Sequence, residues 1–216
     1  MLRLGFRRDK PGLRLLCVGA HSDDLEIGCG GTILEWLSNY QKVEVTWVVL
    51  SAHGRRATEA RKSAEALLRK ASRKTVVIGK LRDGYFPAQI DRAKRLFEHL
   101  KTRQKPDVVL THHLADRHQD HRVAAELTWQ TFRDHLILEY EIPKYEGDLG
   151  QPNFYVPLSR STAERKIDLL LSQFKSQRPR SWFDPSTFKS LMHLRALECR
   201  AESKFAEGFQ VRKCLL

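Results

Sequence analysis

The sequence AHSDDLEIGCGG at residues 20–31 follows directly on an apolar run at residues 13–19 and is the most informative part of the chain. The run is aliphatic and β-branched, so it predicts a buried strand. That strand would end by presenting His21 and two adjacent carboxylates, Asp23 and Asp24. Imidazole and carboxylate together make a site for a divalent cation. The stretch therefore predicts a metal-binding loop at the carboxyl end of a strand.

A second polar cluster lies far along the chain in the same setting. His118, Gln119, Asp120 and His121 follow another apolar run, at residues 108–110. Two such clusters at two strand ends suggest one composite metal site, in which two remote loops hold a single ion.

Strand and helix patterns alternate through the first two thirds of the chain. Strands are predicted at residues 13–19, 43–50, 75–78, 107–111 and 136–142, and helices at residues 32–40, 56–71, 89–102 and 122–133. This alternation predicts an α/β fold, a Rossmann-like three-layer sandwich with a mainly parallel sheet of order 3-2-1-4-5. The first and fourth strands are then neighbours, and both polar clusters fall in the crevice at their carboxyl ends.

The last third of the chain has a different pattern. Residues 153–158 are predicted to be extended, and residues 162–175 and 186–205 to form amphipathic helices on either side of a loop. We expect a C-terminal helical cap near the crevice. Because neither a repeat nor a flexible linker interrupts the sequence, residues 1–216 are expected to form a single domain.

Composition limits the classes of protein to which the chain can belong. Of its 216 residues 41% are hydrophobic and 30% charged, which is typical of a globular domain with its own core. No apolar run approaches the roughly 20 residues of a membrane helix, and the basic residues 1–10 lack the apolar core of a secretory signal. The cysteines, Cys17, Cys29, Cys199 and Cys214, form no C-x-x-C pair. We therefore expect reduced thiols and a cytoplasmic protein.

The formal net charge of +12 attracts anions. The basic residues are spread along the chain and form no dense tail, so a dedicated nucleic-acid partner is not expected. The expected partner is a small-molecule or glycan substrate, whose phosphate, nucleotide or carboxylate group would suit the charge. A homo-oligomer is compatible with the sequence, which does not determine the oligomeric state.

The glycines at positions 28, 30 and 31 do not fit a dinucleotide site. In that site the first glycine follows the strand at once, whereas here His21, Asp23 and Asp24 come first, and two carboxylates would repel a diphosphate. The end of the second predicted strand also lacks the acid that binds ribose. We expect these glycines to let the loop turn into a helix that begins at Thr32 as its N-cap.

The two motifs resemble those of the LmbE-like (PIG-L) deacetylases. The first motif is HSDD at residues 21–24 with EIGCGGT at residues 26–32, and the second is HQDHR at residues 118–122. The resemblance covers residues 13–133 and implies a zinc-dependent enzyme that removes N-acetyl groups, most often from glucosamine derivatives. Ser22 and Gln119 stand where the family usually has proline.

The resemblance implies that His21, Asp24 and His121 bind Zn²⁺, with Fe²⁺ as an alternative, and leave one position for water. Asp23 is our candidate general base. The alternative is that its side chain caps the loop.

His118 is a candidate for stabilising the oxyanion and protonating the leaving amine, with Asp120 orienting it. Alternatively, His118 packs against the loop. His112 and His113 are left out of the metal site, because a histidine at a strand end is more often structural.

Two residues are candidates for substrate binding. Asp83 matches a loop in which family members place a sugar-binding acid, and its alternative is a β-turn aspartate before Gly84. Arg56 precedes Glu59 and would either pin its loop through an ion pair or bind substrate.

The sequence therefore favours a metal-dependent deacetylase acting on an N-acylated amino sugar or glycan intermediate. Two alternatives stay open at this point. One is a zinc amidohydrolase for a non-sugar N-acyl substrate, which would use the same residues. The other is a non-catalytic Rossmann-like module that binds an acidic ligand or RNA through its basic surface.

Overall fold

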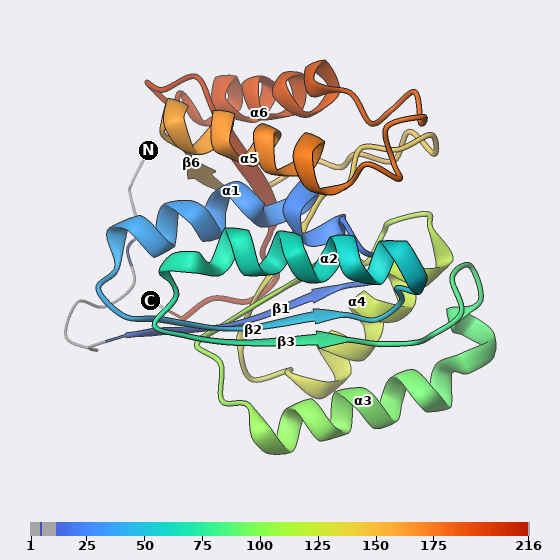
Figure 1. Cartoon of the computed structure of the whole chain (residues 1–216). Coiled ribbons are helices and arrows are strands. Elements are labelled where there is room, and N and C mark those ends of the chain that lie inside the picture. Colours follow the sequence, from blue (N-terminus) through green and yellow to red (C-terminus); the bar gives the residue numbers. More distant parts are fainter. Residues whose placement is uncertain (1–4, 6–11, 216) are drawn as a thin grey trace.

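A computed structural model describes residue 5 and residues 12–215 of the chain. These residues form one seven-stranded sheet with helices on both faces (Figure 1). Its strands are β1 (Leu13–Gly19), β2 (Val43–Val49), β3 (Arg73–Ile78), β4 (Val108–His112), β5 (Leu136–Tyr140), β6 (Phe154–Pro157) and β7 (Ala206–Gln210). The α-helices are α1 (Asp24–Asn39), α2 (Gly54–Leu67), α3 (Ile90–Arg103), α4 (Gln119–Thr131), α5 (Arg160–Gln173) and α6 (Pro185–Cys199), and two short 3₁₀ turns lie at Leu68–Lys70 and Phe86–Gln89.

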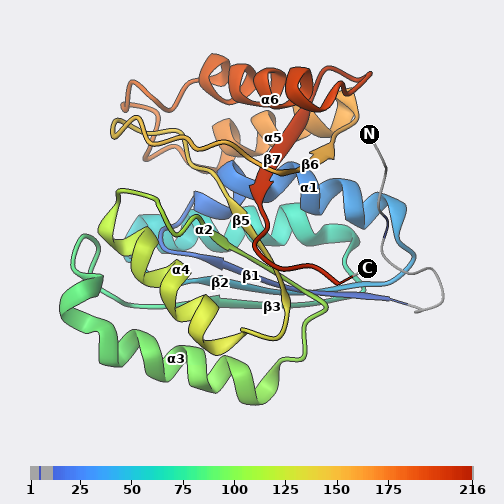
Figure 2. The same ribbon diagram turned by 180° about the vertical axis from the view of Figure 1, so that it is seen from behind.

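The predicted parallel sheet is confirmed. The strand order is β3-β2-β1-β4-β5-β7-β6, and its first five members are parallel in the expected order. Helices α1 and α2 cover one face of the sheet and α3 and α4 the other, while α5 and α6 form a further layer over α1 (Figures 1 and 2). Side chains along β1 alternate between two cores: Leu15 and Cys17 join one, and Leu16 and Val18 join the other.

The sheet extends beyond the prediction by two antiparallel strands. β7 pairs with β5 and with β6, and Figure 2 shows it running from the C-terminal helices to the sheet. The predicted helix at residues 186–205 is too long. Helix α6 ends at Cys199, because the next residue, Arg200, adopts the left-handed conformation with φ 55°. The sequence did not indicate β7, because this strand does not alternate polar exposed residues with apolar buried ones: its charged residue Glu207 is buried.

The expected start of the first helix at Thr32 was wrong. Helix α1 begins at Asp24, so the glycines at 28, 30 and 31 lie inside it rather than in a turn before it. A Cβ on Gly28 would lie 2.7 Å from Cγ of Tyr140, and one on Gly31 would collide with Leu158. Gly28 and Gly31 thus let the helix approach its neighbours, which outweighs their low helix propensity of about 1 kcal/mol each.

A buried ion pair joins the C-terminal elements to the middle of α1. Nζ of Lys166, on α5, lies 2.6 Å from Oε1 of Glu207, on β7, and donates to the carbonyl of Ile27 at 2.6 Å. The Glu207 carboxylate accepts the backbone N–H groups of Gly31 and Thr32 at 2.9 and 2.7 Å. Because both buried charges have partners, α5 and β7 are attached firmly to α1, the helix that contains most of the first motif.

Among the residues that the structure describes, each helix is too short or too polar to cross a bilayer. The basic residues 1–10, apart from residue 5, lie outside the described residues. The expectation that these residues lack the apolar core of a secretory signal therefore falls outside the described part of the chain.

Replacing Gly28 with alanine should destabilise the protein by about 1–3 kcal/mol, because the added methyl group overlaps the Tyr140 ring. Gly30→Ala is the matched control, since its Cβ would meet Leu67 at an ordinary 3.5 Å. That variant should be neutral or up to about 1 kcal/mol more stable. Urea unfolding measures both changes, and equal stability of the two variants would contradict the packing described here.

Candidate metal centre

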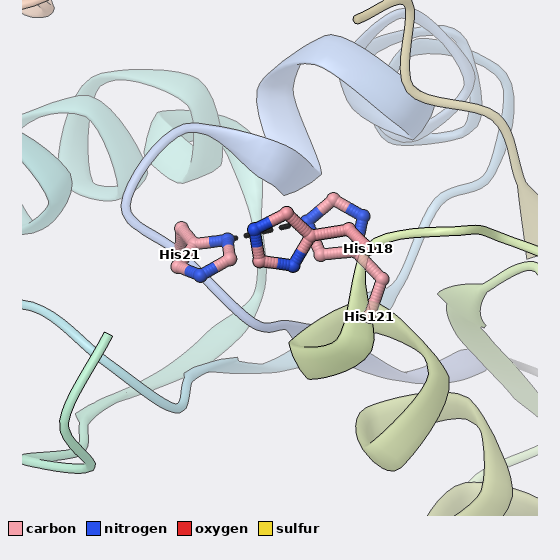
Figure 3. A group of neighbouring side chains, drawn as sticks. All are labelled: His21, His118 and His121. Carbon is pink, nitrogen blue, oxygen red and sulfur yellow. Dashed lines mark hydrogen bonds between the residues drawn. The ribbon is translucent and has the colours of Figure 1, made fainter. Parts of the chain in front are cut away.

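The two sequence motifs meet at the carboxyl ends of β1 and β4. These strands are parallel neighbours, with Cys17 opposite Leu110, so the loops that follow them emerge at the same edge. Figure 3 shows His21 on the loop after β1, facing His118 and His121 at the start of α4. Nδ1 of His21 lies 3.2 Å from Nε2 of His121. The convergence expected from the strand order is therefore present.

Three donor atoms in this crevice form a nearly equilateral triangle. Oδ2 of Asp24 lies 3.4 Å from Nδ1 of His21 and 3.6 Å from Nε2 of His121, which closes the triangle with the 3.2 Å histidine pair. All three side chains are buried. Tetrahedral zinc with bonds of about 2.0–2.1 Å separates its ligand atoms by about 3.3 Å. The residues present therefore fit a zinc-sized ion.

The ring nitrogens that face away from the triangle meet carboxylates. Nε2 of His21 lies 3.1 Å from Oδ1 of Asp83 and 3.2 Å from Oδ2 of Asp120. Nδ1 of His121 lies 2.9 Å from Oδ2 of Asp116. A carboxylate behind a histidine sets its tautomer and ring orientation, which is the usual arrangement behind a metal-binding imidazole.

The electrostatics of the triangle favour an added positive charge. Burial alone would lower the pKa of His21, but the carboxylates of Asp24, Asp120 and Asp83 outweigh burial and raise it well above its usual value. Burial and the neighbouring His112 lower the pKa of His121 to about 4, which keeps this ring neutral with a lone pair to offer. Burial opposes the charge on Asp24, yet the three histidines around it hold its pKa well below the usual value. A divalent cation would supply the charge that these groups otherwise draw from a proton.

Asp23 lies beside the triangle with one oxygen unpaired. Its Oδ1 is 3.5 Å from the Ser22 hydroxyl and 3.6 Å from a guanidinium nitrogen of Arg56. Its Oδ2 is buried and has no hydrogen-bond partner among the described residues. Asp23 precedes α1, but its side chain makes no capping bond, so the alternative of a cap lacks support. Burial and the adjacent Asp24 raise the pKa of Asp23 to about 6, a value suited to a general base.

His118 and Asp120 lie close to the triangle but do not form the pair that we expected. The Asp120 carboxylate accepts the backbone N–H groups of Gly84 and Phe86 at 2.6 and 3.0 Å and contacts His21 rather than the His118 ring. His118 is the N-cap of α4, and its Nδ1 accepts the Asp120 backbone N–H at 3.3 Å. A neutral His118 ring therefore carries its proton on Nε2. Burial and nearby His21 lower the pKa of His118, which favours that neutral form.

Arg56 and Asp83 form an ion pair of 3.0 Å at the rim of the site. Arg56 also donates from Nε to the Ser22 hydroxyl at 3.0 Å. Its neighbour Arg55, rather than Arg56, pairs with Glu59. Asp83 is half exposed and lies in a turn before Gly84, whose φ is +78°. The bond from His21 lowers the pKa of Asp83 to about 2, so Asp83 is a fixed negative charge.

The structure adds two residues that sequence reasoning missed. His112, which we had left out, is wholly buried. Its Nε2 lies 3.0 Å from Oδ2 of Asp24, and its ring stacks on His121 with centroids 3.9 Å apart. Asp116, five residues before His121, lies outside both sequence motifs. The available signal was position: both residues follow the apolar part of β4, the strand that points at the first motif.

The chain resembles known proteins in sequence and in structure. A family model described as PIG-L: GlcNAc-PI de-N-acetylase matches residues 16–132. GalB, the 4-carboxy-2-hydroxymuconate hydratase of Pseudomonas putida, superposes with a TM-score of 0.75 at 19% identity, over 94% of this chain and 98% of its own. A conserved protein of Thermus thermophilus gives 0.71 at 21% identity, over 94% and 96%. The N,N'-diacetylchitobiose deacetylase of Pyrococcus horikoshii gives 0.67 at 20% identity, over 93% and 84%.

At these identities the solved structures show a shared fold, and one of them is a hydratase. The family model is more specific, because it spans both motifs and covers more than half of the chain. Together with the site geometry it supports a hydrolytic deacetylase. The chain belongs to the PIG-L (LmbE-like) family.

Proposed function

We propose that this protein is a zinc-dependent hydrolase that removes an N-acetyl or other N-acyl group from an amino sugar or a glycan or glycolipid intermediate. The observation that carries the proposal is the triangle of His21 Nδ1, Asp24 Oδ2 and His121 Nε2, with edges of 3.2–3.6 Å. Fe²⁺ would suit the same donor set. The family match supports the deacetylase class.

In this proposal His21, Asp24 and His121 hold the metal. The bound ion would polarise the amide carbonyl and lower the pKa of water to about 7. Oδ2 of Asp23, which is buried and unpaired among the described residues, accepts the proton from the attacking water. Asp23 then returns that proton to the nitrogen of the leaving amine. This route balances the proton within one residue and needs no protonated histidine.

His118 would act as a neutral hydrogen-bond donor. Its Nδ1 is occupied by the Asp120 N–H, so the Nε2–H remains for the oxygen that becomes negative as the carbonyl is attacked. Asp120 would hold His21 and the 84–86 loop in place. This differs from the sequence expectation, in which His118 protonates the amine and Asp120 orients His118.

Substrate recognition is proposed for Arg56 and Asp83 at the rim. A carboxylate accepts hydrogen bonds from two sugar hydroxyls, and the guanidinium would suit a phosphate or carboxylate on the same substrate. The net charge of +12 favours such an anionic substrate. We further propose that residues 1–216 form a single domain and that the protein is cytoplasmic. A homo-oligomer is an alternative to the monomer.

His121→Ala should remove bound metal, because it deletes one corner of the triangle. Zinc content per chain after dialysis should fall from about one to near zero. His99→Ala is the matched control, since His99 is exposed on α3 and should not affect zinc content. Stoichiometric zinc in the His121 variant would refute the ligand assignment.

Asp23→Asn should keep its zinc but lower the rate of acetate release by about 10²–10⁴-fold, because the amide cannot take the proton. Acetate is measured with N-acetylglucosamine and N,N'-diacetylchitobiose, next to a panel of N-acetyl amino acids. Asp91→Asn, at an exposed acid on α3, is the control. A rate within about threefold of the unmodified protein would exclude Asp23 as the base. Turnover confined to the amino-acid conjugates would favour the non-sugar amidohydrolase.

Asp83→Asn should raise KM by about 10-fold or more and change kcat less, since a charged hydrogen bond to substrate contributes about 1.5–3 kcal/mol. Steady-state kinetics on the best substrate of the panel measure both constants. A fall in kcat with KM unchanged would instead place Asp83 behind His21 as a positioning residue.

A further inference from the structure

The loop between β5 and β6 contains a largely buried lysine that the proposed mechanism does not use. Nζ of Lys144 lies 2.6 and 2.7 Å from the two oxygens of Asp148 and 3.1 Å from Oδ2 of Asp116. The Asp116 and Asp148 side chains are 3% and 5% exposed. One ammonium thus lies between two buried carboxylates, each of which would be costly to bury without a cation.

Asp116 connects this lysine to the metal centre. The same Oδ2 that contacts Lys144 lies 2.9 Å from Nδ1 of His121. Its other oxygen accepts the backbone N–H of His118 at 2.8 Å. Burial opposes the charge on Asp116, but His121, His112 and Lys144 keep its pKa far below the usual value. A continuous line of contacts therefore runs from Lys144 through Asp116 to the imidazole at one corner of the triangle.

We infer that Lys144 is a positioning residue of the metal centre, which holds the Asp116 carboxylate against Nδ1 of His121 so that Nε2 faces the ion. This inference rests on the proposed function. Among the described residues, the ion pairs and hydrogen bonds of Lys144 go to Asp116, Asp148 and the carbonyl of Ile142, and none goes to the three proposed ligands. Its action is therefore indirect.

Two effects of Lys144 on metal affinity have opposite signs. Its positive charge repels a divalent cation, so removing it by itself would tighten binding. However, its removal also leaves the buried carboxylates of Asp116 and Asp148 without the cation between them, so that Asp116 is no longer held against Nδ1 of His121. Outer partners of metal-binding histidines typically contribute about 10–100-fold to affinity. The negative charge of Asp116, which lies between Lys144 and His121, offsets much of the repulsion between Lys144 and the metal ion. We therefore expect the lost orientation of His121 to weaken zinc binding by more than the lost repulsion strengthens it.

A purely structural role for Lys144 would make a different prediction. Asp148 also accepts the backbone N–H of Arg117 at 2.6 Å, so Lys144 and Asp148 together tie the 143–150 loop to the second motif. If this tie were all that mattered, removing Asp148 would have the same effect as removing Lys144. If Asp116 must be held for His121, Asp148→Asn should have little effect, because Lys144 and Asp116 remain paired.

The test measures Zn²⁺ affinity of the full chain by competition with a chromophoric chelator, for Lys144→Met, Lys144→Arg, Asp148→Asn and the unmodified protein. We expect Lys144→Met to bind Zn²⁺ about tenfold more weakly. Lys144→Arg should recover most of that loss, because its guanidinium can bridge both carboxylates. Asp148→Asn should stay within about threefold of the unmodified protein. Thermal unfolding of the metal-free variants shows that each one is folded.

Unchanged or tighter zinc binding in Lys144→Met would overturn the inference, and so would equal losses in Lys144→Met and Asp148→Asn. If Lys144→Met does not fold, the other two variants still test the inference. Weak zinc binding by Lys144→Arg, together with a large loss of zinc affinity in Asp148→Asn, would contradict it. The failure of the proposed function is distinct: stoichiometric zinc in His121→Ala rejects the ligand set itself, whatever Lys144 does.

Discussion

The donor atoms of His21, Asp24 and His121 lie within 3.6 Å of one another, and the surrounding loops are arranged around this buried triangle. A buried carboxylate beside two buried imidazoles is unfavourable unless protons or a cation balance the charge. The parallel pairing of β1 with β4 brings these atoms together, because it places two loops from distant parts of the sequence at one sheet edge. The site thus follows directly from the point at which the winding of the sheet reverses.

Around this triangle lies an outer layer of carboxylates from different loops. Asp83 comes from the loop after β3, and Asp116 and Asp120 come from the segment that links β4 to α4 and from the first turn of that helix. Each lies within hydrogen-bond distance of an imidazole nitrogen, and each has a further partner: Asp83 pairs with Arg56, Asp120 accepts two backbone N–H groups and Asp116 pairs with Lys144. The centre is therefore held by contacts from most of the loops at this edge, which limits its motion.

The C-terminal third supports the same region from the other side. Lys166 and Glu207 bond to the backbone of α1 within the first motif, at Ile27 and Gly31, and Gly28 lets α1 pack on Tyr140. The hydroxyl of Tyr140 in turn donates to the carbonyl of Val18, at the end of β1. The C-terminal helices form a layer over α1, the helix that begins at Asp24, and are not shown to cover the crevice, where we expected a cap.

The parallel sheet, its strand order and the meeting of two polar clusters could be predicted from the sequence, because these follow from local periodicity and from the rule that parallel strands end at one edge. The sequence did not reveal that the glycines lie within α1, that β7 extends the sheet, or that His112, Asp116 and Lys144 surround the site. Those features became visible only in the folded chain. They depend on contacts between side chains that are remote in sequence, such as Gly28 on Tyr140 or Lys144 on Asp116, and no local pattern records such contacts.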